Sequence, residues 1–274
     1  MSNPTKQGSM RKLMAALAVA VLASMLAIIS SPAGAQTPAS PTTNRISGAD
    51  RYATAVAVAR SQVGAAGPTT GLVIASGESS ADALSAAPLT SDTAPMILVP
   101  KDSIPDSVTD FISDYKGILA ANTTVVYFMG GTSAISAANY TALTTALTTA
   151  GDTTPPTFVR LAGADRYATA ALVAARTGMM LAADTLIIVS GESWADGISA
   201  GVMSAESNYP IVLQTKTGNN ASAKSTIDTY LAKVSSVKTF MIIGGESAIS
   251  TDTEEYLINT KGVPVANIRR LSGA

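Results

Sequence analysis

The octapeptide Gly-Ala-Asp-Arg-Tyr-Ala-Thr-Ala occurs twice in this chain, at Gly48–Ala55 and at Gly163–Ala170. It heads a repeat whose later landmarks return at nearly the same spacing, 114 to 115 residues. Those landmarks are Ser-Gly-Glu-Ser at 76–79 and 190–193, and Gly-Gly-x-Ser-Ala-Ile-Ser at 130–136 and 244–250. Solenoid repeats are roughly 20–50 residues long, so a period of this size predicts that each copy is a globular unit with its own core.

Within each copy, short apolar runs alternate with stretches of helical periodicity. The expected helices lie at 50–63, 80–91, 106–116 and 133–149, and then at 165–181, 194–206, 222–234 and 247–261. The expected strands lie at 72–75, 96–99, 125–129 and 158–161, and then at 186–189, 211–213, 239–243 and 268–271. Continuous apolar strands are typical of parallel sheets whose two faces are both covered. The sequence therefore predicts an α/β fold of two tandem Rossmann-like units with right-handed crossovers.

The first 35 residues have the three parts of a secretory signal peptide. Lys6, Arg11 and Lys12 form a basic leader, Leu13–Ile29 is uncharged, and Ala33-Gly34-Ala35 is a small-x-small cleavage site. An uncleaved membrane anchor is the alternative, but seventeen residues are at the short limit of a bilayer span. We therefore predict secretion, with no transmembrane anchor after cleavage. The predicted domains are the signal peptide at 1–35, a flexible leader at 36–44, unit 1 at 45–159 and unit 2 at 160–269. Residues 270–274 are either the start of a third repeat or the closing strand of unit 2.

Composition excludes several classes of function. The chain has no cysteine and no histidine, which removes thiol chemistry, the commonest general base and the commonest zinc ligand. A zinc hydrolase or a Ser-His-Asp enzyme is therefore not expected, and no metal site or cofactor is predicted. Without the three leader cations the chain has 15 basic and 19 acidic residues, so it is not expected to bind nucleic acid.

The ordered motifs R-[I/L]-x-G-A-D-R-Y-A-T-A, S-G-E-S-x-A-D-[A/G]-[L/I]-S-A and G-G-x-S-A-I-S resemble those of the cell wall binding repeat 2 family, from Arg45 to Ala274. The resemblance implies Rossmann-like or toprim-like units in secreted surface proteins of Gram-positive bacteria, attached non-covalently to the cell wall. It also implies anionic wall polymers as ligands in some members, and usually three copies in a compact pseudo-trimer. Other members carry an effector domain such as an amidase or a protease. This sequence departs from the pattern, because it has two copies with a short stub and no effector domain.

Arginines gather in the repeat heads and in the helices that follow them. Arginine grips phosphate or carboxylate groups with two parallel hydrogen bonds. We therefore take five arginines as the candidate site for an anionic polymer: Arg45, Arg51, Arg160, Arg166 and Arg270. The alternative is that these arginines pair with Asp50, Asp165 or a neighbouring helix end and lock the repeats together.

A second candidate site follows the first strand of each copy, where parallel sheets place their ligands. Its residues are Ser76, Glu78 and Asp82 in the first copy and Ser190, Glu192 and Asp196 in the second. Capping of the next helix explains the serines and aspartates. The alternative is a carboxylate pair that binds a metal or acts as acid and base. Trp194 replaces Ser80 in the second copy; packing between repeats is the favoured interpretation, and stacking on a sugar is the alternative.

Together these observations predict a secreted, non-catalytic protein that binds an anionic or glycan polymer of the cell wall through tandem repeats. Repetition suits this task, because linked weak sites gain avidity. Two alternatives remain open: a protein related to an amidase-type wall hydrolase, and a structural component of the surface layer. Homo-oligomers formed through the repeats are a further expectation.

Overall fold

A computed structural model describes residues 44–66, 71–90, 94–120, 125–148, 155–217 and 221–273. The predicted signal peptide and almost all of the leader lie outside these residues. Both sequence copies belong to one compact unit, Ile46–Ala274. None of the helices in the described residues combines the length and apolar character that a bilayer span requires.

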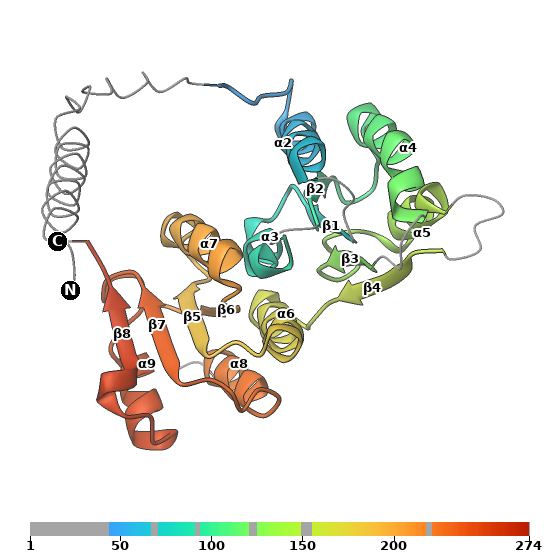
Figure 1. Cartoon of the computed structure of the whole chain (residues 1–274). Helices are drawn as coiled ribbons and strands as arrows, with labels where there is room; N and C mark the ends of the chain where they lie inside the picture. Colours follow the sequence, from blue (N-terminus) through green and yellow to red (C-terminus); the bar gives the residue numbers. More distant parts are fainter. Residues whose placement is uncertain are drawn as a thin grey trace, which may run out of the picture. The chain divides into compact units, whose positions relative to one another are not determined.

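Copy 1 alternates helices and strands in the predicted order (Figure 1). Its helices are α2 (Arg51–Ala66), α3 (Ser80–Ser85), a short 3₁₀ helix η1 (Ala87–Thr90), α4 (Asp106–Ala120) and α5 (Ala137–Leu147). Its strands are β1 (Gly71–Ser76), β2 (Met96–Val99), β3 (Val125–Met129) and β4 (Thr157–Leu161).

Copy 2 repeats this order. Its helices are α6 (Arg166–Leu181), α7 (Ala195–Ser207), α8 (Ala221–Leu231), α9 (Asp252–Glu255), a π-helical turn η2 (Tyr256–Thr260) and a 3₁₀ turn η3 (Val265–Asn267). Its strands are β5 (Thr185–Ser190), β6 (Ile211–Gln214), β7 (Thr239–Ile243) and β8 (Ile268–Leu271).

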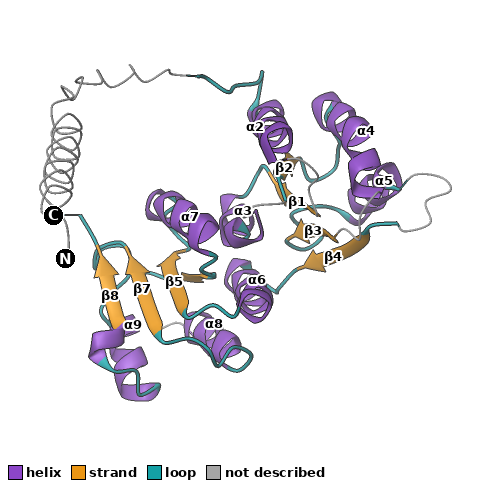
Figure 2. Ribbon diagram, viewed as in Figure 1, coloured by secondary structure: helices purple, strands orange, loops and turns teal. Residues whose placement is uncertain are grey.

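Each copy forms one parallel four-stranded sheet flanked by helices (Figure 2). The strand orders are β2-β1-β3-β4 and β6-β5-β7-β8, so the two sheets share one topology. The α/β prediction is confirmed. Strand β8 pairs in parallel with β7, from Phe240 opposite Ile268 to Ile243 opposite Leu271. Residues 268–271 therefore form the fourth strand of the copy 2 sheet.

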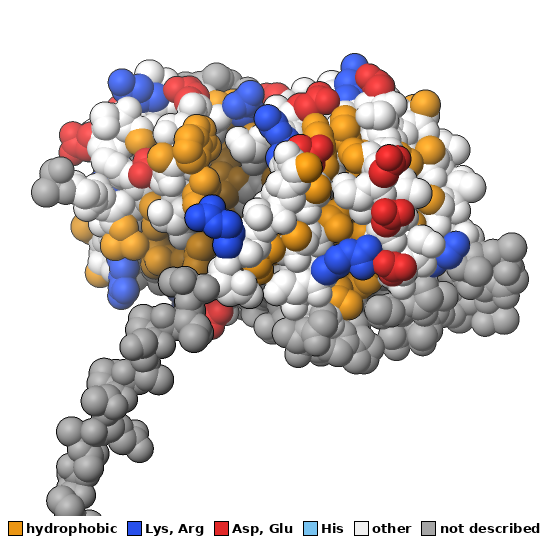
Figure 3. All heavy atoms as spheres, turned by 90° about the horizontal axis from the view of Figure 1, so that it is seen from above, with side chains coloured by type: hydrophobic (Ala, Val, Ile, Leu, Met, Phe, Trp, Pro, Cys, Tyr) orange, Lys and Arg blue, Asp and Glu red, His pale blue; other side chains and the backbone are white. Residues whose placement is uncertain are grey.

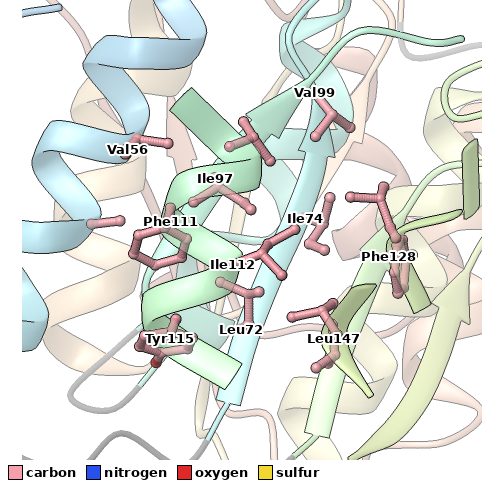
Figure 4. Close-up of a cluster of buried hydrophobic side chains, with 14 of the residues drawn as sticks. Val56, Leu72, Ile74, Ile97, Val99, Phe111, Ile112, Tyr115, Phe128 and Leu147 are labelled. Atoms are coloured by element: carbon pink, nitrogen blue, oxygen red, sulfur yellow. The ribbon is translucent and has the colours of Figure 1, made fainter. Parts of the chain in front are cut away.

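One face of the first sheet is covered by helices of its own copy. Leu72, Ile74 and Phe128 point from the strands into a cluster with Phe111 and Tyr115 of α4 (Figure 4). All five side chains are almost fully buried. Burying a side chain of this size contributes about 1.5–3 kcal/mol, so this cluster is a main source of the stability of copy 1.

The opposite face of the first sheet is covered partly by copy 2. Val73, Tyr127 and Met129 form a buried cluster that includes Ala86 of copy 1 and Val173 of α6. Figure 1 shows α6 lying between the two sheets. The corresponding face of the second sheet is covered by α7 and by residues of α3 and η1, including Ala81. Each copy thus supplies helices to the other, and the two pack as one body.

Three predicted helices begin later than expected or are broken. The expected helix at 80–91 is interrupted after Ser85, whose Oγ donates to the carbonyl of Asp82 (2.9 Å); Pro88 lacks the N–H that a continued α-helix would use. The expected helix at 133–149 begins only at Ala137, because Ser136 caps it by accepting from Asn139 N (3.2 Å). The expected helix at 247–261 begins at Asp252 and widens into the π-helical turn η2.

Candidate functional site

The repeated octapeptide builds a tight entry into the first helix of each copy. Gly48 N donates to Thr54 Oγ1 (3.0 Å), and Asp50 Oδ1 accepts from Ala53 N (2.7 Å) as a helix cap. A Cβ on Gly48 would come within 2.4 Å of the backbone of Ala53, so the turn requires glycine. In copy 2 the same bonds join Gly163 N to Thr169 Oγ1 (2.9 Å) and Ala168 N to Asp165 Oδ1 (2.7 Å). Local structure thus explains why Gly, Asp and Thr recur in both heads.

The arginine and tyrosine of each head reach the end of the first strand. Arg51 Nη1 donates to the carbonyl of Gly77 (2.7 Å), and the Tyr52 ring lies so close to Gly77 that a Cβ there would meet Cε1 at 2.5 Å. Copy 2 repeats this contact between Arg166 Nη1 and the carbonyl of Gly191 (2.9 Å), with Tyr167 against the glycine. Within the described part of the chain neither guanidinium forms an ion pair. Both arginines are exposed and use one N–H group in these bonds.

Arg160 and Arg270 lie on the last strand of each sheet and have a different role. Arg160 Nη1 donates to the carbonyls of Gly130 (3.2 Å) and Ile135 (2.9 Å), and its guanidinium lies over the Tyr140 ring at 4.6 Å. Arg270 Nη1 donates to the equivalent carbonyls, those of Gly244 (3.0 Å) and Ile249 (2.9 Å). Both guanidinia therefore fasten the Gly-Gly turn of their own copy, and these bonds do not join one repeat to the other.

Arg270 also forms a bidentate ion pair with Glu254. Its Nε and Nη2 lie 3.0 and 2.9 Å from the two carboxylate oxygens. Arg45, the fifth arginine of the predicted set, is exposed. The five arginines thus fall into three groups. Arg160 and Arg270 fasten the Gly-Gly turn of their own copy. Arg51 and Arg166 lie beside a strand end and form no ion pair in the described residues, and Arg45 is exposed.

The Ser-Gly-Glu-Ser segments form a turn closed by the first serine. Ser76 Oγ accepts from Glu78 N (3.1 Å), and Ser190 Oγ accepts from Glu192 N (3.2 Å). The prediction that the serines and aspartates cap the next helix is wrong. The N-cap residues are Ser79 and Trp194, and neither makes a side-chain cap bond. The hydroxyl groups of Ser76 and Ser190 instead accept hydrogen bonds from backbone N–H groups of the turn that follows the strand.

Glu78 and Asp82 lie in different surroundings. Glu78 is exposed and its Oε1 accepts from Lys101 N (3.3 Å). Asp82 is buried, with its carboxylate against Gly130, where a Cβ would meet Oδ2 at 2.4 Å. Asp196 occupies the equivalent place against Gly244. Each aspartate thus lies beneath the Gly-Gly turn, at a glycine with a positive φ of 85° or 119°.

Burial raises the pKa of Asp82 above its ordinary value, and Arg166 of the other copy opposes this shift. The two side chains are therefore electrostatically coupled across the boundary between copies. Among the described residues, no group of three or more histidine, cysteine, aspartate or glutamate side chains has a geometry that could hold a metal ion.

A groove of about 180 Å³ lies where the two copies meet. Copy 1 contributes Ser80, Ala81 and Leu84, and copy 2 contributes Arg166, Ser190–Trp194 and Leu213. The predicted residues Arg166, Ser190 and Glu192 are thus brought together, with side chains from the other copy that sequence reasoning did not connect to them. We call this hollow the inter-copy groove.

Trp194 is 65% exposed at this groove. The favoured interpretation, in which it packs between repeats, is therefore wrong for most of its surface. A larger hollow of about 370 Å³ lies between α6 and α8. Its charged side chain, Asp165, already caps α6, so the inter-copy groove is the better candidate site.

The fold and these motifs define a class of tandem α/β repeat proteins with arginine-bearing heads. The model of cell wall binding domain 2 (CWB2) matches residues 45–140 and 160–254. The chain therefore belongs to the CWB2 family.

Known proteins of similar sequence and structure are longer. The chain is 31% identical over 216 residues to N-acetylmuramoyl-L-alanine amidase LytC of Bacillus subtilis (strain 168), which covers 78% of this chain and 38% of the amidase. Cwp8 and Cwp6 from Clostridium difficile are similar in structure, each with a TM-score of 0.63, at 24% and 23% identity. They cover 83% and 87% of this chain, which spans only 35% and 36% of their lengths. These structures support the fold.

Proposed function

We propose that this protein is a secreted, non-catalytic module that attaches to a polymer of the cell wall. The observation that carries the proposal is the match of both copies to a cell wall binding domain, over most of the described residues. The proposal extends to the ligand site. Arg51 and Arg166, which form no ion pairs in the described part of the chain, are proposed to contact the polymer at the strand ends.

The lack of catalytic function is part of the proposal. Without histidine or cysteine, acid–base or nucleophilic chemistry would depend on carboxylates. Glu78 and Glu192 each accept a hydrogen bond from a lysine backbone N–H, and Asp82 lies beneath a glycine turn. These arrangements suit a structural role. The similarity to an amidase covers 38% of that protein, so it does not by itself indicate amidase activity in this chain.

Co-sedimentation with purified Gram-positive cell walls tests wall binding. We expect the protein to sediment with intact walls and to lose this ability when the wall polymers are removed chemically. Failure to sediment with intact walls contradicts the proposal. A zymogram with the same walls tests catalysis, and a zone of clearing would show that the protein is an enzyme.

Substitution of the head arginines tests the ligand site. Arg166→Gln and Arg51→Gln should weaken sedimentation while the circular dichroism spectrum stays unchanged. Arg60→Gln is the matched control, because it also removes an exposed positive charge, one paired with Asp114 at 2.8 Å on the surface. Equal weakening by all three substitutions would indicate only a loss of overall charge.

A further inference from the structure

The inter-copy groove has the size and the lining of a site for one sugar ring. Its volume of about 180 Å³ equals about six water molecules at about 30 Å³ each. Leu84 supplies apolar surface, with the buried Ala81 and Leu213 behind it, and polar side chains from both copies surround it. Ligand sites commonly have this composition, an apolar lining with a few placed polar groups.

Trp194 provides an aromatic platform at the edge of the groove. Its indole is 65% exposed, although a large aromatic side chain normally gains free energy by burial. The C–H face of a pyranose ring packs on such a surface. Ile198 and Val202 continue the exposed stripe along α7, at 57% and 71% exposure. Figure 3 shows hydrophobic side chains exposed across the face that it views. Trp194 is the member of this stripe that lines the groove.

Arg166 and Glu192 line the groove with opposite charges. The guanidinium of Arg166 has five N–H groups and uses one for Gly191, so it can donate to hydroxyl groups of a ligand. Glu192 Oε1 accepts a long bond from Lys216 N (3.4 Å), and the carboxylate retains lone pairs for further donors. A sugar hydroxyl both donates and accepts, so adjacent hydroxyls suit this pair. A polyanion would meet the Glu192 carboxylate as well as Arg166.

We infer that the inter-copy groove binds an uncharged, N-acetylated sugar ring of the wall glycan, stacked on Trp194. This inference rests on the proposed wall-binding function and names the chemistry of its ligand. The apolar surface of Leu84 accommodates the acetamide methyl group, Glu192 accepts from the amide N–H, and Arg166 donates to ring hydroxyls. Ser80 stands at the position of Trp194 in copy 1, so the first copy lacks this platform.

Intrinsic fluorescence gives a direct test, because Trp194 is the only tryptophan in the chain. Titration of the full-length mature protein with a trimer of N-acetylglucosamine should shift the indole emission to shorter wavelength and reach saturation. A glucose trimer should bind at least fivefold more weakly, and inorganic polyphosphate should leave the emission unchanged. Arg166→Gln should weaken binding of the N-acetylated trimer at least tenfold.

Wall sedimentation of variants separates this inference from the proposed function. Trp194→Ala should weaken wall binding at least tenfold and Trp194→Phe should retain most of it. Ile198→Ala, which shortens the next residue of the same stripe outside the groove, is the matched control and should bind as wild type. If Trp194→Ala and wild type sediment equally with walls, and the trimer leaves the emission unchanged, the inference fails while wall binding stands.

Other outcomes also overturn the inference. Saturation by polyphosphate that salt abolishes would assign the groove to an anionic polymer. Equal affinity for both trimers would remove the role of the acetamide group. A rise in solution mass with protein concentration, accompanied by an emission shift without sugar and abolished by Ile198→Ala, would make the stripe a contact between copies of the chain. If wild type does not sediment with walls, the proposed function fails whatever the titration shows.

Discussion

Val58 and Val173 stand at equivalent positions of the two head helices, yet they differ in burial. Val58 on α2 is 41% exposed, whereas Val173 on α6 is fully buried against the first sheet, in a cluster with Val73 and Tyr127. Substituting each by alanine makes the same chemical change in helices of similar sequence. The difference between the two effects therefore measures the packing between copies.

The expected magnitude follows from the two methyl groups removed. At about 0.8 kcal/mol per buried carbon, Val173→Ala loses about 1.6 kcal/mol of transfer free energy, and the cavity raises the loss to about 2–3 kcal/mol. Alanine is the better helix former by about 0.5 kcal/mol, which offsets part of the loss. We expect Val173→Ala to lower the free energy of unfolding by about 2 kcal/mol. At the half-exposed Val58 the loss of transfer free energy is smaller, and the same gain in helix propensity nearly cancels it. Val58→Ala should therefore leave the free energy of unfolding almost unchanged.

Urea unfolding followed by circular dichroism checks this expectation. With a denaturant slope of about 2 kcal/mol per M, the midpoint of Val173→Ala should fall by about 1 M, while that of Val58→Ala should stay within about 0.3 M of wild type. If the two variants shift the midpoint equally, α6 does not lie buried between the copies, and the reasoning that joins them into one body is refuted.

Four further substitutions, one of them a control, test local features by the same unfolding assay. Burial raises the native pKa of Asp82 above 3.8. Just above that pH the native state binds more protons than the unfolded state, so the free energy of unfolding falls as pH rises through this window. Asp82→Asn should abolish this fall, and an unchanged pH profile would contradict the raised pKa of Asp82. Gly48→Ala should destabilise the protein by about 1–3 kcal/mol because the new Cβ meets backbone atoms, whereas Gly273→Ala, with no atom within 4 Å of the new Cβ, should change stability by less than about 0.5 kcal/mol. Asp165→Ala removes the cap bond to Ala168 N (2.7 Å) and should cost about 1 kcal/mol; no loss would show that the bond is replaced by water.

The sequence predicted the sheets more accurately than the helices. The limits of β2, β3, β7 and β8 match the predicted strands. Continuous apolar runs mark β2 and β3 in the sequence. Strand β8 contains Arg269 and Arg270, so its place follows from the repeat of the motifs and not from an apolar run. Helix ends depend on local hydrogen bonds that periodicity does not encode. The Oγ of Ser136, for example, decides where α5 begins, and the predicted start at Ser133 lay four residues before Ala137.

The roles of the arginines could not be read from their positions in the motif. Arg160 and Arg166 are six residues apart in one head. The first reaches back to Gly130 at the end of a strand of copy 1, and the second reaches forward to Gly191 in copy 2. Each partner is 25 to 30 residues away in sequence, and the strand order that brings it close is a property of the whole sheet.

Duplication of the motifs does not give two equal sites in this structure. Arg51 and Arg166 make the same bond to a glycine carbonyl, but Arg166 is also coupled electrostatically to Asp82 of the other copy. The copies pack asymmetrically, since α6 covers the first sheet while Val58 on the equivalent helix α2 faces solvent. A head-to-tail contact of this kind makes identical sequences occupy different environments. The inter-copy groove arises from this asymmetry, because it needs the strand end of one copy and the short helix of the other.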